Sequence, residues 1–362
     1  MPMVENWHSK RLYSEMRYSS IGSKRSNSIR LGYVPLADCA PLAVAQETGI
    51  FVRHGLNVSL HRELGWATIR DSLYYGDLDA AQSIAGLAFA LGFGMTDLRC
   101  DVCVPLILNL HGNAITLSKE LPYEDIRDGS GLKKFLSNHW KKDRPFTLAT
   151  THRFSSHSVL LQTWLKRHGL AEADIEIIVL PPPLMPRHLK AGHIDGYCVG
   201  EPYNSEAILD GFGWSPVTSS ELSYSHPEKV LLLSGHFVQE RKAESTELVA
   251  ALIESCRLCQ DPNFREDLIS ILAQDKYTAA SDEVLRNSLG ASFFNGIERI
   301  SNHSFHIFHG ESVNRPGTDK ASWMLAGLRN SGNLPDNWSC GSLSLLYRED
   351  IYLAAMSNLA KA

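Results

Sequence analysis

The chain has 362 residues, a formal net charge of −5, 44% hydrophobic residues and 21% charged residues. This length suits two domains of ordinary size, and the composition is typical of a soluble globular protein. The net negative charge argues against general nucleic-acid binding, and no apolar run reaches the roughly 18 residues that a membrane-spanning helix needs.

The N-terminal stretch from Met1 to Ile29 is polar and basic and contains no apolar core of the kind found in secretory signals. We expect residues 1–29 to form a poorly ordered extension. The sequence therefore predicts a cytoplasmic protein.

The first third of the chain alternates between strands and helices. Asp38 is predicted to cap a helix, Pro41 suits its first turn and Gly49 its end. The predicted strands are Arg30 to Val34, Asn57 to His61, Asp79 to Ser83 and Val102 to Leu110, followed by a break at residues 111–113 and a further strand from Ala114 to Leu117. The predicted helices are Ala40 to Thr48, Ala67 to Tyr75 and Gly86 to Leu91.

A second unit follows from Ser118, and the chain returns to the first unit near Gly213. Three prolines after Leu180 predict an extended exit from a strand. The predicted strands are Pro145 to Ala149, Ile177 to Leu180, Tyr197 to Val199 and Lys229 to Leu233, and the predicted helices are Leu132 to Trp140, Ser158 to Arg167, Leu184 to Ala191 and the long region after Glu244.

This alternation predicts an α/β protein with largely parallel sheets and two lobes. We assign residues 30–117 and 215–340 to lobe 1, residues 118–214 to lobe 2, and residues 341–362 to a C-terminal segment.

One short sequence motif occurs twice. A helix end, Gly76, an apolar residue, Asp79 and a small residue recur 116 residues later around Gly192 and Asp195. Such a distance favours two similar lobes over a short-period repeat, although chance similarity would also explain so common a pattern.

Donor-rich residues stand where predicted strands end or helices begin. Trp66 offers an indole N–H, Asn113 an amide, His157 a ring nitrogen and Lys229 a positive charge. Individually, such residues are often packing, capping or surface residues. Together, near helix N-termini that favour anions, they indicate a site for a small oxyanion.

The sequence gives little indication of a metal site or a catalytic motif. The pairs Cys100/Cys103 and Cys256/Cys259 have zinc-site spacing, but the first begins a strand and the second lies inside a helix, so buried free thiols are expected. The histidines at 303, 306 and 309 are expected to be packing or surface residues, and no nucleophile, phosphate-binding or dinucleotide-binding motif is present. The sequence predicts no cofactor and no metal.

Several short segments resemble the nitrate/bicarbonate solute-binding family of ABC transporters. They are Asp38 to Leu42, Trp66 to Asp71, Val179 to Pro183, Cys198 to Pro202 and His226 to Lys229. The similarity covers roughly Arg30 to Pro335. It implies a type II periplasmic-binding-protein fold, with two α/β lobes and an anion in a cleft between them.

The resemblance also implies ligand-binding residues. They are Trp66, Gly112, Asn113, His157, Glu201 and Lys229. Asn113 stands where nitrate transporters carry Gln, and this shorter amide bears on affinity and on the choice between nitrate and nitrite. A lysine at position 229 favours nitrate or nitrite over the calcium-assisted bicarbonate branch of the family.

Three functions remain open. Family members that lack an export signal resemble a cytoplasmic nitrate/nitrite sensor of nitrate assimilation, which releases an RNA-binding ANTAR-type antiterminator protein when its ligand binds. The chain is alternatively the substrate-binding component of a nitrate/nitrite ABC transporter. The thiamine-pyrimidine synthases share the fold, but the chain lacks their cysteine-rich motif. We therefore expect a binding protein rather than an enzyme.

Overall fold

The first lobe is built on a five-stranded sheet. A computed structural model describes residues 27–96, 98–126, 129–140, 144–170, 175–301, 303–310, 312–334 and 338–361, so most of the predicted N-terminal extension lies outside the described residues. The spatial order of the strands is β2 (Val58–Arg62), β1 (Ile29–Tyr33), β3 (Ala80–Ile84), β11 (Lys229–Ser234) and β4 (Val102–Ile107).

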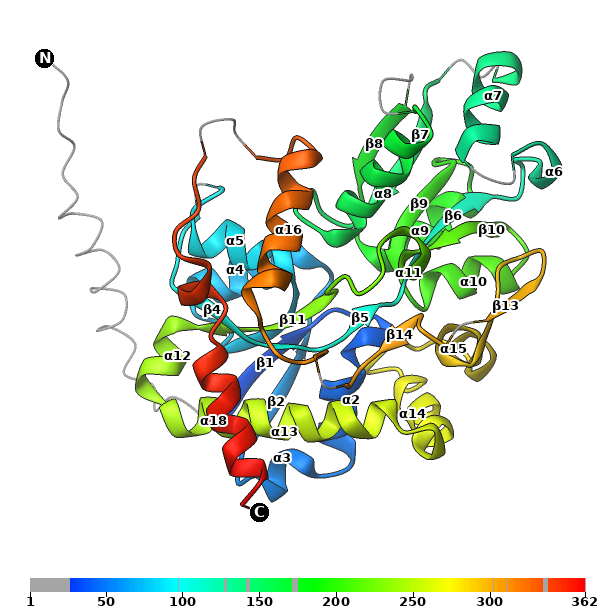
Figure 1. Cartoon of the computed structure of the whole chain (residues 1–362). Helices are drawn as coiled ribbons and strands as arrows, with labels where there is room; N and C mark the ends of the chain where they lie inside the picture. Colours follow the sequence, from blue (N-terminus) through cyan, green and yellow to red (C-terminus); the bar gives the residue numbers. More distant parts are fainter. Residues whose placement is uncertain are drawn as a thin grey trace, which may run out of the picture.

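Helices cover both faces of this sheet (Figure 1). Successive side chains of a strand point to opposite faces, and in β11 Leu231 and Leu233 enter one core while Val230 and Leu232 enter another. The first face carries α2 (Ala40–Glu47), α3 (Ile50–Arg53), α13 (Lys242–Gln260), α14 (Arg265–Leu272) and α18 (Glu349–Leu359), and the second carries α4 (Trp66–Tyr75), α5 (Ala85–Gly92) and α17 (Leu343–Leu346), with α12 (Gly235–Glu240) after β11.

The second lobe repeats this plan with another five-stranded sheet. Its strand order is β10 (Gly213–Thr218), β6 (Asn113–Ser118), β9 (Gly196–Gly200), β7 (Phe146–Thr150) and β8 (Ile175–Val179). Its helices are α6 (Tyr123–Ile126), α7 (Gly129–His139), α8 (Ser156–Arg167), α9 (Met185–Lys190), α10 (Tyr203–Leu209) and α11 (Ser219–Leu222).

The remaining elements are short or peripheral. They are β5 (Leu110–His111) paired with β14 (His306–Ile307), the hairpin β12 (Ser292–Phe294) and β13 (Arg299–Ser301), α15 (Asp282–Leu289), α16 (Thr318–Asn330), and three 3-10 helices at Ala37–Cys39, Pro182–Leu184 and Pro262–Phe264. No helix in the described part of the chain is both long and apolar enough to cross a membrane.

The two α/β lobes are confirmed, but the sheets are mixed rather than largely parallel. β11 runs antiparallel to both of its neighbours, and so does β6. These are the strands that enter each sheet directly after the chain has crossed from the other lobe. A strand arriving from the crossover runs opposite to the strands of the parallel β-α-β units.

The crossover points also differ from the predicted boundaries. β6 and β10 both pair within the second sheet, although residues 113–117 and 215–218 were assigned to lobe 1. The pattern of a strand indicates its buried faces but not the sheet that it joins. In the described part of the C-terminal segment, α18 packs on α13 and β4 of the first lobe.

The internal repeat corresponds to the same supersecondary unit in each lobe. Gly76 ends α4 with φ 76°, and Gly192 follows α9 with φ 70°, a left-handed conformation that glycine adopts without strain. The chain then enters β3 in the first lobe and β9 in the second. Leu78 and Ile194, the apolar residues of the motif, are both buried.

The aspartates of the repeat make equivalent ion pairs. Arg30 donates Nη2 to Asp79 Oδ1 at 2.7 Å and Nε to Oδ2 at 3.0 Å. Arg144 donates to both oxygens of Asp195 at 2.7 and 2.8 Å. Each carboxylate also accepts a backbone N–H of the adjacent strand segment, from Arg30 and Thr147 respectively. The repeated aspartate therefore links β3 to the parallel strand β1 in the first lobe, and β9 to the parallel strand β7 in the second.

The proline-rich exit from β8 is helical rather than extended. Pro182 to Leu184 form a 3-10 turn that runs directly into α9, where Pro186 occupies an early helical position. Proline fits such first turns because its missing N–H has no partner there in any case.

The lobes meet closely at Gly86, near the start of α5. A methyl group on Gly86 would overlap the carbonyl oxygen of Phe154, which lies in the loop before α8 of the second lobe. Beside this contact, α16 packs against both α5 and α8, as the orange helix in Figure 1 shows. Glycine at position 86 is thus required for the observed approach of the lobes.

We predict that Gly86→Ala destabilises the chain by about 1–3 kcal/mol, as overpacking against a fixed backbone atom typically does. Urea unfolding measures the effect. Gly92→Ala on the same helix is the control, because its methyl group would meet side chains and no backbone atom: Leu346 at 2.9 Å and Val102 at 3.6 Å. Equal stability of both variants would show that the Gly86 contact does not constrain the lobes.

Candidate functional site

The four donor-rich residues predicted to bind an anion lie together at the junction of the lobes. With Asp38, Gln82 and Glu228 they form a cluster that we call the buried group. Trp66 is the first residue of α4 and Lys229 the first of β11, both in the first lobe. Asn113 begins β6 and His157 is in the first turn of α8, both in the second lobe. All four side chains are almost completely buried.

Lys229 is the positive charge of this group, and it is shared between two carboxylates. Its Nζ lies 2.7 Å from Asp38 Oδ2 and 2.6 Å from Glu228 Oε1, and 5.4 Å from the centre of the Trp66 ring. All three ionisable side chains are shielded from solvent. Because two carboxylates surround one ammonium, Lys229, Asp38 and Glu228 together carry a net charge of −1.

Glu228 contacts three of the four donor-rich residues. Its Oε1 accepts from Lys229 Nζ at 2.6 Å and lies 3.5 Å from His157 Nε2, while its Oε2 accepts from Asn113 Nδ2 at 2.7 Å. A carboxylate is itself a small planar oxyanion. Glu228 therefore takes up donors that would otherwise be free for a bound anion.

Three polar atoms of the four donor-rich residues have no hydrogen-bond partner within the described residues. They are Trp66 Nε1, His157 Nε2 and Asn113 Oδ1. Buried polar atoms are rarely left unpaired, so these atoms are candidates for contacts with a ligand. The indole N–H and the imidazole nitrogen are suitable donors for an oxyanion, whereas Asn113 presents its acceptor oxygen because its amide nitrogen is committed to Glu228.

His157 is neutral at physiological pH. Burial lowers its pKa to about 3, against the opposing effect of the Glu228 charge. Its Nδ1 pairs with the hydroxyl of Thr151 at 3.0 Å. When this hydroxyl is the donor, the ring carries its proton on Nε2, the unpaired atom that faces Glu228.

The two carboxylates differ in how readily they take up a proton. Burial raises the pKa of Asp38 to about 6, although Lys229 and a hydrogen bond from Gln82 Nε2 oppose this shift. Although burial opposes it, the charge of Lys229 holds the pKa of Glu228 well below its usual range. Asp38 is therefore the carboxylate of the two that takes up a proton more readily.

Asp38 was predicted to cap α2, and this prediction is wrong. The N-cap of α2 is Cys39, with no side-chain cap, while the Asp38 side chain points to Lys229 and Gln82. The 3-10 turn Ala37–Cys39 turns this carboxylate into the interior.

Gly112 and Glu201 border the group without joining it. Gly112 has φ 88°, its carbonyl accepts the N–H of Glu201, and a Cβ there would overlap the ring of His306. The Glu201 carboxylate instead accepts from the Ser205 N–H at 3.1 Å and the Ser288 hydroxyl at 2.8 Å. The structure thus brings the Glu201 backbone, but not its charge, to the edge of the site.

The cysteines and histidines that were weighed as metal ligands lie in ordinary structural positions. Cys103, Cys256 and Cys259 are buried, as expected, whereas Cys100 is partly exposed. His306 packs over Gly112, and His309 Nδ1 lies 2.6 Å from Asn314 Oδ1.

Sequence reasoning missed three residues of the group: Asp38 as a charge, Gln82 and Glu228. A signal existed for Glu228, because it directly precedes a lysine at the start of an apolar strand. Adjacent residues of a strand normally point to opposite faces, but Glu228 lies just before β11, where the backbone is not yet constrained by the sheet.

Two α/β lobes whose polar side chains meet at their junction define the type II periplasmic-binding-protein fold. The chain belongs to the NMT1-like family, whose sequence model matches residues 22–273.

Among its relatives are proteins of nitrate and bicarbonate transport in cyanobacteria. The chain is 35% identical to the nitrate import ATP-binding protein NrtC and 36% identical to the bicarbonate transport ATP-binding protein CmpC, both of Synechocystis sp.. Each match covers 86% of this chain but only 47% of the relative, so the chain spans about half the length of these proteins. The nitrate/nitrite binding protein NrtA of Synechococcus elongatus is 27% identical, over 92% of this chain and 78% of the relative.

Solved structures confirm the fold. The periplasmic nitrate-binding protein NrtA from Synechocystis superposes with a TM-score of 0.85 at 23% identity, covering 93% of this chain and 90% of that one. The desulfurization enzyme DszB shares the fold with a TM-score of 0.61 at 12% identity, covering 92% of this chain and all (100%) of that one. The fold therefore accommodates both binding proteins and enzymes.

We predict that Lys229→Met destabilises the chain by about 3–5 kcal/mol, because the substitution leaves two buried carboxylates without their cation. Adding Asp38→Asn should restore part of this loss, since one of the unpaired charges is then removed. Chemical denaturation of the single and double variants measures both effects.

Lys276→Met is the matched control. Lys276 also lies 2.7 Å from a carboxylate, that of Glu47, but it is 53% exposed, so the expected loss is below about 1 kcal/mol. An equally small loss for Lys229→Met would mean that the buried ion pairs do not stabilise the fold.

Proposed function

We propose that the chain binds nitrate or nitrite at the junction of its lobes, between Trp66, Asn113, His157 and Lys229. The observation that carries this proposal is the buried ammonium of Lys229 beside two unpaired ring nitrogens. A lysine, an indole N–H and a neutral imidazole N–H are strong donors for an oxyanion in a site from which water is excluded. The similarity to the nitrate/nitrite binding protein NrtA supports the same ligand.

An added anion must overcome the negative charge already present. Two carboxylates face Lys229, and a third negative charge in the same interior is unfavourable unless one of them is neutralised. Asp38 has the higher pKa of the two and is the group that takes up the proton. The anion then competes with Glu228 for Lys229, His157 and Asn113.

Thermal melting with added ligands tests the proposal. A ligand that binds only the folded chain stabilises it by RT ln(1 + [L]/Kd), about 2.7 kcal/mol at a hundredfold excess over Kd. Nitrate or nitrite should raise the melting temperature in a saturable manner, and sulfate at equal ionic strength should not. No difference between nitrate and chloride would overturn the proposal.

We predict that nitrate affinity rises as the pH falls from about 8 to about 6 and then levels off. Asp38 is surrounded by Lys229, Glu228 and Gln82, and a nearby anion raises its pKa above the value of about 6 in the free chain. The complex then holds more protons than the free chain, and affinity rises by at most about tenfold for each pH unit.

Calorimetry at several pH values measures this dependence. Asp38→Asn is the discriminating variant, because its neutral carboxamide should abolish the dependence and keep the affinity high. A pH dependence that survives this substitution would assign the proton uptake to another group.

We predict that Glu228→Gln raises nitrate affinity by about tenfold or more, because it removes a competing charge within a few ångströms of the ligand. Trp66→Phe should lower the affinity by about tenfold, since the ring remains but one donor to a charged ligand is lost. Calorimetric titration of both variants at one pH distinguishes these opposite effects. A decrease for Glu228→Gln would make Glu228 a supporting residue rather than a competitor.

Bicarbonate is a second candidate ligand. Unlike nitrate, it carries a hydroxyl group, and this donor would pair with the unpaired Asn113 Oδ1. The similarity to CmpC supports this candidate. Melting with bicarbonate in the same ligand series distinguishes the two, and Asn113→Asp, which keeps the acceptor, should favour bicarbonate over nitrate.

For the role in the cell we propose a cytoplasmic sensor of nitrate assimilation, which releases an ANTAR-type antiterminator protein when the anion binds. The alternative is the binding component of an ABC transporter, and the similarity to NrtA, NrtC and CmpC supports this alternative. α13 is an unsuitable contact surface for either partner, because its central residues, from Leu248 to Ile253, are fully buried.

Affinity purification of the chain with and without nitrate separates these roles. A sensor retains the antiterminator only without nitrate, whereas a transport component retains ABC-transporter subunits. Recovery of the chain outside the cytoplasmic membrane would contradict the sensor.

A further inference from the structure

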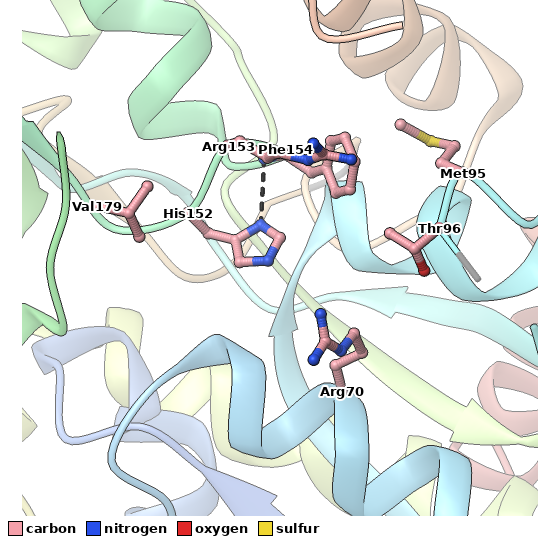
Figure 2. Close-up of a pocket in the computed structure, with 7 residues that line it drawn as sticks. All are labelled: Arg70, Met95, Thr96, His152, Arg153, Phe154 and Val179. Atoms are coloured by element: carbon pink, nitrogen blue, oxygen red, sulfur yellow. Dashed lines mark hydrogen bonds between the residues drawn. The ribbon is translucent and has the colours of Figure 1, made fainter. Parts of the chain in front are cut away.

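A pocket of about 520 Å³ is lined by residues of both lobes (Figure 2). Its volume is in the range of sites for small molecules. The lining residues come from both lobes: Arg70, Met95 and Thr96 from the first, and His152, Arg153, Phe154 and Val179 from the second.

The charge of this pocket is positive. Two of its seven lining residues are arginines, and none is acidic. Asp71 lies outside the lining but 2.7 Å from the Arg70 guanidinium, and it offsets part of that charge. The guanidinium of Arg153 lies 4.3 Å from the ring centre of Phe154. Burial lowers the pKa of His152 to about 4, and the charges of Arg70 and Arg153 add to this shift, which places all three side chains within the same electrostatic environment.

His152 supplies a defined donor. Its Nδ1 accepts the backbone N–H of Phe154 at 3.1 Å, so the proton of the neutral ring is on Nε2. In Figure 2 the His152 ring and the Arg70 guanidinium point toward one another across the pocket. An oxyanion between them would meet an N–H group from each lobe.

In each lobe, residues that line the pocket are close in the chain to residues of the buried group. Arg70 follows Trp66 by one turn of α4, so the two side chains lie on the same helix face. In the second lobe, residues 152–154 directly precede Ser155, the N-cap of α8, and His157 follows within the first turn.

We propose that this pocket is an outer site for small oxyanions, arranged in series with the buried group. The proposal rests on the proposed anion-binding function. Nitrate or nitrite first binds between Arg70, His152 and Arg153, and then moves to Lys229 when the lobes separate at the Gly86 contact. The outer site increases the rate of capture, because a cleft lined by one sign of charge raises the local concentration of the opposite ion.

Stopped-flow measurements of Trp fluorescence test the kinetic consequence. In the chain carrying Arg70→Gln and Arg153→Gln, the association rate of nitrate should fall by about three- to tenfold at low ionic strength, while the dissociation rate stays unchanged. The difference should disappear at high salt. The control is Arg167→Gln, which removes an exposed charge at the far end of α8 and should leave both rates unchanged. Unchanged association rates in the double variant would overturn the proposal.

NMR of the His152 ring tests the outer site independently of the buried one. Nitrate should shift its resonances, assigned by their loss in His152→Gln, and the Arg70→Gln, Arg153→Gln variant should show no shift. A His152 shift without tight nitrate binding would support the outer site and contradict the proposed function. Tight nitrate binding, an unchanged association rate in the double variant and no His152 shift would together support the function and contradict the outer site.

Discussion

The structure depends on one buried ammonium, Lys229, held between the carboxylates of Asp38 and Glu228. Burying three charged groups is costly, and it is tolerated only when each charge has a close partner of opposite sign. Lys229 belongs to the first lobe, but Glu228 also accepts a hydrogen bond from Asn113 of the second lobe. Glu228, one of the two carboxylates paired with the lysine, therefore also connects the two lobes.

This arrangement links ligand binding to the relative position of the lobes. An anion that takes Lys229, His157 and Asn113 from Glu228 replaces an internal carboxylate with an external one of similar shape. The side chains of the group are fully buried, and the lobes are in contact at Gly86 and Phe154. Under the proposed function, entry and release of the anion require the lobes to move apart, and the anion would shift the population of closed and open forms by its differential affinity for them.

Sequence reasoning predicted those features that local patterns determine. The strand at Lys229, the helix start at Trp66 and the repeat ending in Asp79 and Asp195 follow from periodicity and from the positions of glycine. It could not predict that Asp38 and Glu228 share one lysine, because this pairing depends on where a 3-10 turn and a strand entry meet in space. The sheet membership of β6 was unpredictable for the same reason, since the apolar pattern of a strand does not name its neighbours.

A crystal structure of the chain grown with nitrate tests the central claim most directly. The account predicts a planar three-oxygen ligand at the lobe junction, with Trp66 Nε1, His157 Nε2 and Lys229 Nζ within hydrogen-bond distance of its oxygens and Glu228 displaced from at least one of its present partners. Nitrate bound elsewhere, with the contacts of Glu228 to Lys229 and Asn113 unchanged and the two ring nitrogens still unpaired, would contradict it.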